Sequence, residues 1–307
     1  MAEVVTVPAA WALPGAMLLA ALALAGAVVD GAFVGRRGHG GVHGTAVPFV
    51  ESARLLRQRR RVPPAADRLL WRIGTGGAVV AASLMVVVVP IGPFVLVDIP
   101  VGVVWFTAVD VTVWALVWLA GWGPNAVYPL VGGYRFLAQA LAYELPLMVA
   151  VIAPAVAAGS LRLTDVAQAQ AGLWFAVWMP LAFGIFCLGV VAFSVWGPFR
   201  AAVAGDIAGG VLAESSGVDR LLSAAGRYAL LAAGATVAVP LYLGGGAGPL
   251  LPPWLWVPVK ALVVLVGVVA LARRLPVVRP DRFLEAGWLV LLPLALLQLV
   301  IVAVVTQ

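Results

Sequence analysis

Eight stretches of this chain consist almost entirely of apolar residues, and none shows the alternation of apolar and polar positions that marks a half-buried strand. A hydrocarbon core about 30 Å thick is crossed by roughly 20 apolar residues in an α-helix. The pattern therefore predicts an all-α integral membrane protein with about eight transmembrane helices, forming one domain over residues 1–307. The predicted crossings are residues 9–29, 75–97, 103–121, 136–158, 172–195, 228–246, 254–272 and 286–305.

Composition agrees with this class of protein. Hydrophobic residues make up 64% of the 307 positions and charged residues 10%, far outside the range of water-soluble domains. Because lipid offers no hydrogen bonds, only helices and closed barrels cross a bilayer, and unbroken apolar runs favour helices. The first residues contain no Lys or Arg, unlike a cleavable secretory signal, so the first run is expected to remain as a helix.

Basic residues are concentrated on one predicted face of the membrane. Seventeen of the 19 Lys and Arg residues fall in the connections 30–74, 122–135, 196–227 and 273–285, whereas the opposite face holds only Arg162. The positive-inside rule therefore predicts that these connections are cytoplasmic and that both termini lie outside, in an inner or plasma membrane. The net charge of +6 then describes a cytoplasmic surface, and no nucleic-acid partner is expected.

The first of these connections is about 45 residues long. Its stretch FVESARLLRQRRR (49–61) predicts a basic amphipathic helix at the membrane surface, which either anchors the chain to anionic lipid or docks a soluble partner. The stretch GRRGHGGVHG (35–44) lacks the glycine spacing of a dinucleotide fingerprint. We expect a flexible turn there, with His39 and His43 in water.

Two acidic residues, Asp110 and Glu144, lie clearly inside predicted crossings. An ionised carboxylate at mid-membrane costs about 2.5–3.5 kcal/mol even on the insertion scale, so such residues face the bundle interior, a partner or water. At about 1.5 Å per residue, Asp110 lies roughly 16 Å and Glu144 roughly 12 Å from the cytoplasmic ends of adjacent helices. The two carboxyls either share a proton or a water molecule, or each donates a hydrogen bond to a neighbouring helix. Lys260, also within a crossing, is expected to extend outward or to pair with an acid.

Side chains that bind metals or redox groups are scarce. The chain has one cysteine, Cys187, and two histidines in a loop, which supply no ligand set for zinc, haem or an iron–sulfur cluster. No nucleophile–histidine–acid set and no phosphate-binding lysine motif is present. We therefore expect no cofactor bound by this chain, and any redox centres would belong to other subunits.

Several motifs together resemble one family, the H subunit of NADH-quinone oxidoreductase, the respiratory complex I. The most specific is GWGPNAVYPLVGGYRFLAQALAYELPL, which is similar to the family's Gly-Trp, Asn, Tyr, Arg and QxxxYE-P pattern. Further matches follow in family order: PFVESARLL, DIAGGVLAESSG, YLGGG and LPVVRPDRFLEAGW. The matching segments are residues 121–147, 48–56, 206–217, 242–246 and 275–288.

The resemblance implies a non-redox subunit that forms the membrane-side wall of a quinone chamber and couples quinone reduction to proton translocation. Its substrate would be quinone, and its partners the other membrane-arm and peripheral-arm subunits, which carry any NADH, flavin and iron–sulfur sites. The residues that we expect in the proton relay are Glu144, Asp206, Glu214, Asp110 and Lys260. Those expected at the quinone chamber or the peripheral-arm contact are Glu51, Arg54, Arg135, Gln139, Arg200, Arg279 and Asp281.

The third basic connection departs from the family pattern. Phe193 and Trp196 stand where the family has Glu and Arg, and Arg200 stands where an Asp follows Pro-Phe. Asp30 is a weak match to the family's acid at the end of helix one. The missing acids leave two alternatives open: a divergent assembly or anchoring subunit that has lost coupling, and the membrane subunit of a related ion-translocating hydrogenase that uses no quinone.

Overall fold

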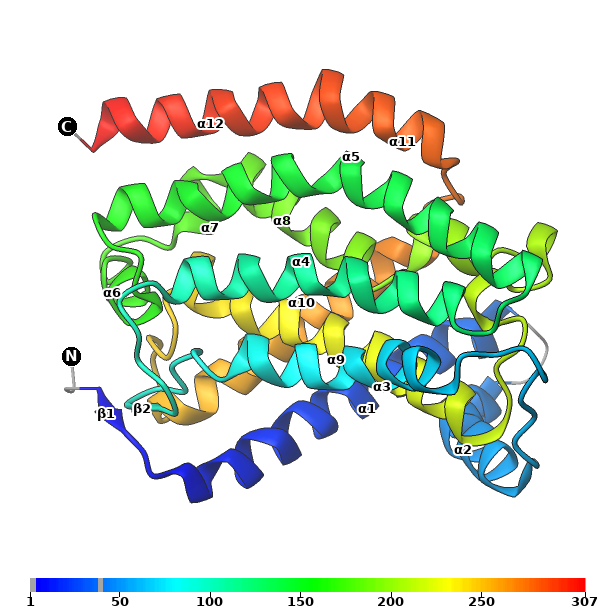
Figure 1. Ribbon diagram of the computed structural model, residues 1–307. Helices are drawn as coiled ribbons and strands as arrows, with labels where there is room; N and C mark the ends of the chain where they lie inside the picture. Colours follow the sequence, from blue (N-terminus) through cyan, green and yellow to red (C-terminus); the bar gives the residue numbers. More distant parts are fainter. Residues whose placement is uncertain (1–3, 38–40, 307) are drawn as a thin grey trace.

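The apolar runs fold into long helices that lie side by side (Figure 1). The computed structural model describes residues 4–37 and 41–306; His39 and the side chain of His43 lie outside the described residues. Eight helices of the described chain are long and apolar enough to cross a membrane, which confirms the all-helical class with about eight spans. The helices are α1 (Ala12–Arg37), α2 (Val47–Arg57), α3 (Arg68–Val86), α4 (Gly102–Trp122), α5 (Val127–Ala158), α6 (Leu163–Gln168), α7 (Phe175–Trp178), α8 (Pro180–Phe193), α9 (Gly217–Tyr242), α10 (Pro253–Arg274), α11 (Pro280–Ala286) and α12 (Leu292–Val305).

Helix α3 differs most from the predicted crossing at 75–97. It begins at Arg68 because the Asp67 side chain caps it, accepting hydrogen bonds from the backbone N–H groups of Leu69 and Leu70, both at 3.0 Å. It ends at Val86, ahead of Pro90 and Pro93, since prolines cannot donate the backbone hydrogen bond that a helix requires.

Three other helices begin well away from the residue that the apolar pattern indicates, and one of them is α5, which begins at Val127 and not at residue 136. The fifth predicted crossing starts at residue 172, but α8 starts at Pro180, after the single turn α7. The sixth is predicted from residue 228, whereas α9 already begins at Gly217 and carries polar residues into the bundle. The described residues also form a short two-stranded sheet, in which β1 (Val5–Thr6) pairs in parallel with β2 (Phe94–Val95).

The helices form two layers. In Figure 1, α12, α5, α4, α3 and α1 follow one another from top to bottom, with α8, α9 and α10 behind them. Small residues permit the close approaches: a Cβ on Gly74 of α3 would lie 2.3 Å from the backbone nitrogen of Ala120 in α4. Helices α5 and α9 are the most buried of the eight, and they carry the polar residues described below.

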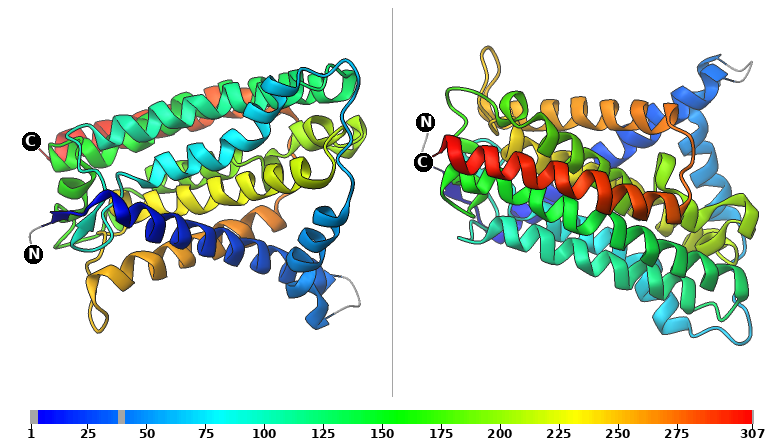
Figure 2. Two further views of the ribbon diagram at one scale, coloured as in Figure 1. Left: turned by 60° about the horizontal axis from the view of Figure 1, so that its bottom comes forward. Right: turned by 90° about the horizontal axis from the view of Figure 1, so that it is seen from above.

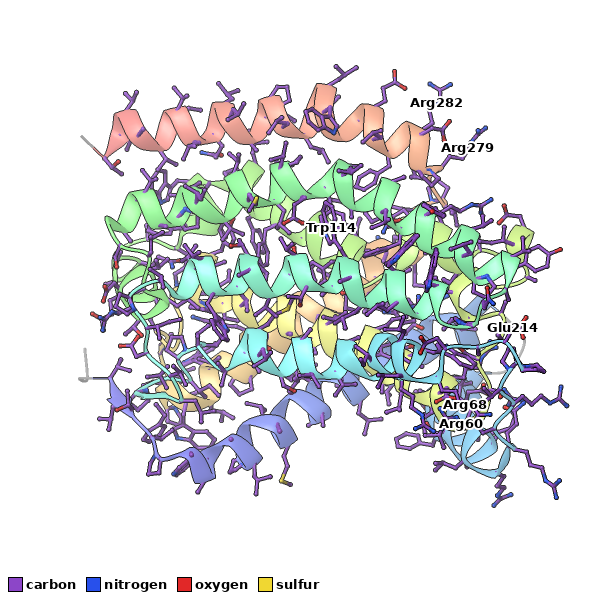
Figure 3. All side chains as sticks on the ribbon, in the orientation of Figure 1. Arg60, Arg68, Trp114, Glu214, Arg279 and Arg282 are labelled. Atoms are coloured by element: carbon purple, nitrogen blue, oxygen red, sulfur yellow. The ribbon has the colours of Figure 1, made fainter. Side chains whose placement is uncertain are left out.

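The two ends of the bundle differ in charge. Strand β1 and the end of α12 lie at one end, together with α6, whereas α2, α11 and the connection between α8 and α9 lie at the other (Figures 1 and 2). That second end carries Arg60, Arg68, Arg279 and Arg282 (Figure 3). We refer to it as the arginine-rich end.

Candidate functional site

The most unusual polar residues are two carboxyls inside the bundle, Asp110 of α4 and Glu144 of α5. They are 1% and 8% exposed, and none of their four oxygens has a hydrogen-bond partner among the described residues. The structure thus brings the two acids within electrostatic range of each other, and neither donates a hydrogen bond to a neighbouring helix in the part of the chain that is described.

Two further side chains complete this site. Tyr143 is 2% exposed, and its hydroxyl is unpaired among the described residues, as is the indole N–H of Trp114. The indole lies close to the Tyr143 hydroxyl and the Glu144 carboxyl without meeting hydrogen-bond geometry. Figure 3 shows Trp114 between α4 and α5. We call Asp110, Trp114, Tyr143 and Glu144 the acidic cluster.

Local sequence explains how α5 presents Glu144. Pro146 lacks an N–H, so the carbonyl of Ala142 loses its usual helical donor. Gly287 of the π-helical turn η7 (Gly287–Leu291) lies against this carbonyl, and the indole N–H of Trp288 donates to the carbonyl of Leu141 at 3.1 Å. Turn η7, which leads into α12, therefore packs on α5 at Leu141 and Ala142, next in sequence to Tyr143 and Glu144 of the acidic cluster.

Toward the arginine-rich end, α5 carries Arg135 and Gln139. Arg135 donates two hydrogen bonds to Asp206, at 3.0 and 2.7 Å, and this guanidinium holds the pKa of Asp206 below its ordinary value. The buried Gln139 amide donates to the carbonyl of Ala192 at 2.8 Å. Asp206 is 60% exposed, and Glu214 lies at the surface of the same end (Figure 3). The structure therefore separates these two acids from Glu144.

A second polar network surrounds Asp30, which is 6% exposed. Its carboxyl accepts a hydrogen bond from the Tyr228 hydroxyl at 3.0 Å and pairs with the guanidinium of Arg273. The ring of Tyr228 lies 4.7 Å from that of Trp196, and the guanidinium of Arg227 lies 4.5 Å from the same indole while donating to a backbone carbonyl. Asp30, only weakly suggested by the sequence, is thus held firmly in the bundle.

This network lines a cavity of about 590 Å³ among α1, α9, α10 and the connection after α8. We call it the arginine cavity, because the described residues of its wall include four arginines and one acid. The charged residues are Asp30, Arg200, Arg220, Arg227 and Arg273, and apolar residues of the wall include Leu231, Val268, Val269 and Ala272. Of the predicted chamber residues, Arg200 lies here.

Within the described residues Lys260 pairs with no acid, one of the two outcomes that the sequence left open. Its side chain is buried, and its ammonium donates to the carbonyls of Leu243, Gly245 and Ala247 at 2.6, 2.9 and 2.7 Å. The ring of Trp174 lies 4.4 Å away. The ammonium therefore holds the glycine-rich turn after α9, at the end of the bundle opposite the arginine-rich end.

The remaining predicted contact residues lie at the surface of the arginine-rich end. Glu51 and Arg54 pair at 2.5 Å on α2, and the hydrogen bond from Arg54 lowers the pKa of Glu51. Arg279 and Asp281 pair at 3.2 Å at the start of α11, and both are exposed. Neither pair contacts the acidic cluster.

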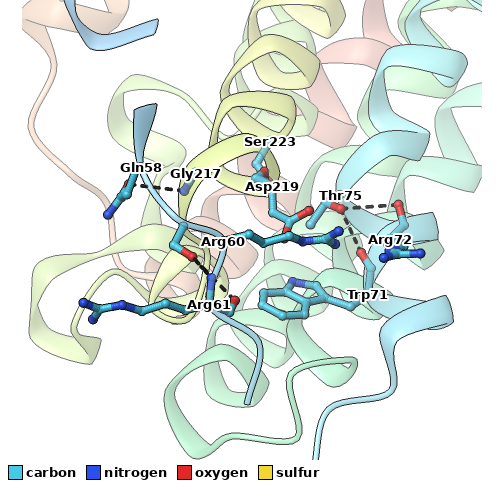
Figure 4. Close-up of polar contacts among 10 residues, drawn as sticks. Gln58, Arg60, Arg61, Trp71, Arg72, Thr75, Gly217, Asp219 and Ser223 are labelled. Carbon is cyan, nitrogen blue, oxygen red and sulfur yellow. Dashed lines mark hydrogen bonds and ion pairs between the residues drawn. The ribbon is translucent and has the colours of Figure 1, made fainter. Parts of the chain in front are cut away.

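Sequence reasoning missed one buried acid, Asp219. It is 4% exposed and accepts a hydrogen bond from Arg60 at 2.5 Å, which ties the segment before α3 to the start of α9 (Figure 4). Beside it, the hydroxyl of Ser216 accepts from the backbone N–H of Arg61 at 2.7 Å. No local pattern reveals a pair separated by 159 positions.

Comparison with known proteins shows to which family the chain belongs. A family model for NADH dehydrogenase matches residues 8–303. An NADH-quinone oxidoreductase H subunit of Geobacter sulfurreducens, numbered 2 in that organism, is 35% identical over 272 residues, covering 85% of this chain and 83% of the relative. The NADH-quinone oxidoreductase H subunit of Geobacillus kaustophilus is 33% identical over 272 residues, with coverages of 87% and 82%.

An H subunit of Cereibacter sphaeroides, also numbered 2, is 35% identical over 257 residues, covering 82% of this chain and 80% of the relative. No group of three His, Cys, Asp or Glu residues that could hold a metal occurs within residues 4–37 and 41–306, so this chain offers no metal site there. Matched over nearly its whole length, the chain belongs to the NADH dehydrogenase family, within the group of H subunits of the complex I membrane arm.

Proposed function

We propose that this chain forms the membrane-side wall of a quinone chamber in a complex-I-like NADH-quinone oxidoreductase, and that its buried acids couple quinone reduction to proton translocation. The observation that carries the proposal is the acidic cluster. Two carboxyls that have no hydrogen-bond partner among the described residues lie inside an apolar bundle, where an ionised carboxylate is costly, so a nearby change of charge would shift them between protonated and ionised forms.

The arginine-rich end is the cytoplasmic face in this proposal, with both termini outside and the chain in the plasma or inner membrane. The peripheral arm would then dock on α2, α11 and the connection between α8 and α9. Charged pairs on this surface, Glu51 with Arg54 and Arg279 with Asp281, would supply polar contacts to it.

The arginine cavity is the proposed position of the quinone, which is a substrate of the complex and not a cofactor of this chain. A quinone carries two carbonyl oxygens that accept hydrogen bonds, and the cavity wall presents guanidinium donors. Its apolar side, with Leu231 and Val268, suits the hydrophobic part of the same molecule.

The coupling path proposed here follows α5. Arg135 and Gln139 lie one helical turn apart, and Tyr143 follows after another turn, adjacent to Glu144. A change of charge in the chamber would alter proton occupancy at Glu144 and Asp110. In this scheme Lys260 is a fixed positive charge at the far end, and Asp206 and Glu214 respond from the cytoplasmic surface.

Glu144→Gln tests the proposal in the assembled complex reconstituted into vesicles. The amide keeps the shape of the side chain but cannot exchange a proton, so we expect proton translocation per quinone reduced to fall while the amount of assembled complex stays the same. Glu285→Gln, an equal change at an exposed position of α11, serves as the control. Undiminished proton translocation in Glu144→Gln would refute the role of the carboxyl.

A second function, anchoring without coupling, is favoured by the separation of the surface acids from Glu144. It predicts that the unmodified complex reduces quinone without building a proton gradient. The same vesicles distinguish the two functions, because under anchoring alone Glu144→Gln changes nothing.

A further inference from the structure

The arginine cavity carries more positive charge than its own acids neutralise. Asp30, the one acid among the described lining residues, is already bound to Arg273 and Tyr228. Among the described residues, Arg227 donates to backbone carbonyls and to no carboxylate. Arg200 forms no ion pair within the described residues.

The neighbouring charges do not change this balance. Arg220 lies within electrostatic range of Glu51, but that carboxylate is paired with Arg54 at 2.5 Å. Arg200 and Arg227 lie close enough to repel each other. Positive groups that share a cavity are stabilised by an anion, and a neutral quinone does not supply one.

The shape of the cavity restricts which anion fits. Its volume of about 590 Å³ is large for inorganic phosphate alone, and one side of the wall is apolar. Leu275 and Val277 line the cavity and are also exposed, so it opens at the surface of the bundle beyond the end of α10. A ligand with an anionic head and an apolar tail therefore matches both halves of the wall.

We propose that the arginine cavity binds the phosphate group of an anionic membrane phospholipid. Arg200 and Arg220 hold the phosphate, and the acyl chain lies along Val268 and Val269 of α10. Basic pockets between transmembrane helices are a recurrent mode of lipid recognition, since guanidinium groups bind phosphate oxygens in pairs. The lipid would share this cavity with the proposed quinone, but the inference depends only on the charge and shape of the wall.

To test this, the purified complex is delipidated and then incubated with phosphatidylglycerol or phosphatidylcholine. Native mass spectrometry measures how much of each lipid the complex retains. We expect selective retention of phosphatidylglycerol. The variant Arg200→Gln/Arg220→Gln should bind it about 30-fold more weakly, because each arginine near a membrane surface contributes roughly a factor of five. Both side chains are exposed, and neither forms an ion pair with a buried acid of the described structure, so the variant is expected to fold.

The matched control is Arg274→Gln/Arg282→Gln, which removes the same charge from exposed positions outside the cavity. Its phosphatidylglycerol binding should stay within about threefold of the unmodified complex. Equal weakening in both variants would show a surface-charge effect and overturn the site. Equal retention of both lipids, or displacement of the lipid by millimolar inorganic phosphate, would overturn it as well.

Quinone reductase activity, measured in parallel, separates this inference from the proposed function. An active complex without selective lipid binding refutes the lipid site and leaves the quinone chamber standing. Selective binding that depends on Arg200 and Arg220, in a complex that never reduces quinone, supports the lipid site and refutes the chamber.

Discussion

The substitution Gly287→Ala tests how closely turn η7, which leads into α12, packs on the backbone of α5. The added Cβ would lie 2.2 Å from the carbonyl oxygen of Ala142, 2.9 Å from its carbonyl carbon and 3.1 Å from its Cα. All three atoms belong to the backbone, so no side-chain rotation relieves the clash. The two helices must separate, and the hydrogen bond from Trp288 to Leu141 must lengthen.

The magnitude follows from these distances. A carbon in contact with a carbonyl oxygen normally lies about 3.3–3.6 Å from it, so the backbones must move apart by roughly 1 Å. Overpacking of this kind costs about 1–3 kcal/mol, and a rigid backbone partner places Gly287→Ala at the upper limit. Alanine favours helix over glycine by about 1 kcal/mol, which leaves a net destabilisation of about 2 kcal/mol.

Gly267→Ala on α10 is the matched control, because a Cβ there meets no atom within 4 Å. That variant should gain up to about 1 kcal/mol from helix propensity. The two variants therefore differ by about 3 kcal/mol, or on the order of 5–10 °C in apparent midpoint. Heating detergent extracts of a fluorescently tagged chain, followed by size-exclusion chromatography, measures the midpoint. Equal midpoints for the two alanine variants would refute the close packing of α12 on α5.

Two further predictions concern the arginine-rich end. Arg60→Gln should destabilise the chain by about 1–2 kcal/mol, because it leaves the buried carboxylate of Asp219 unpaired. Asp219→Asn should destabilise it less, because that change leaves only a half-exposed arginine without its partner. Limited proteolysis of the segment before α3 measures the effect of each variant. Arg135 lowers the pKa of Asp206. The stabilisation from this ion pair is therefore fully present above the ordinary pKa range of a carboxyl, and it is lost as pH falls through the lowered pKa of Asp206. Arg135→Gln should raise that pKa toward 3.8, measurable by NMR titration of labelled aspartate, and an unchanged titration would contradict the pairing.

The apolar runs predict the helices well because the bilayer sets their minimum length and few residues interrupt them. The same reasoning finds the acidic cluster: the sequence predicts Asp110 and Glu144 at overlapping depths on adjacent helices, and they lie within electrostatic range. The depth of each acid in the membrane could be counted along the chain, but the direction in which each helix face points could not. Neighbours such as Trp114 depend on which way each helix faces, which a run of apolar residues does not define.

Other features depend on contacts between distant segments. Hydropathy could not separate the end of α3 from the following non-helical stretch, because both are apolar and the prolines stand several residues after Val86. The pair of Arg60 and Asp219 exists only once α9 packs beside α3. Lys260 binds three carbonyls whose positions depend on a turn containing Gly244 and Gly245, both with positive φ.

The distance along α5 limits how coupling can operate in this chain. Arg135 and Glu144 are nine residues apart, or about 14 Å along the helix axis, which is too far for direct proton transfer between the surface and the acidic cluster. Two unit charges at that separation interact by about 1.2 kcal/mol with an effective dielectric constant of 20. A charge change near Arg135 would therefore shift proton occupancy at Glu144 by about sevenfold. Phe193 and Trp196 stand where the family pattern has charged residues. Under the proposed function, this electrostatic route along α5 would therefore have to carry the response of Glu144 to the chamber, and a loss of proton translocation in Glu144→Gln would be the sharpest measure of coupling.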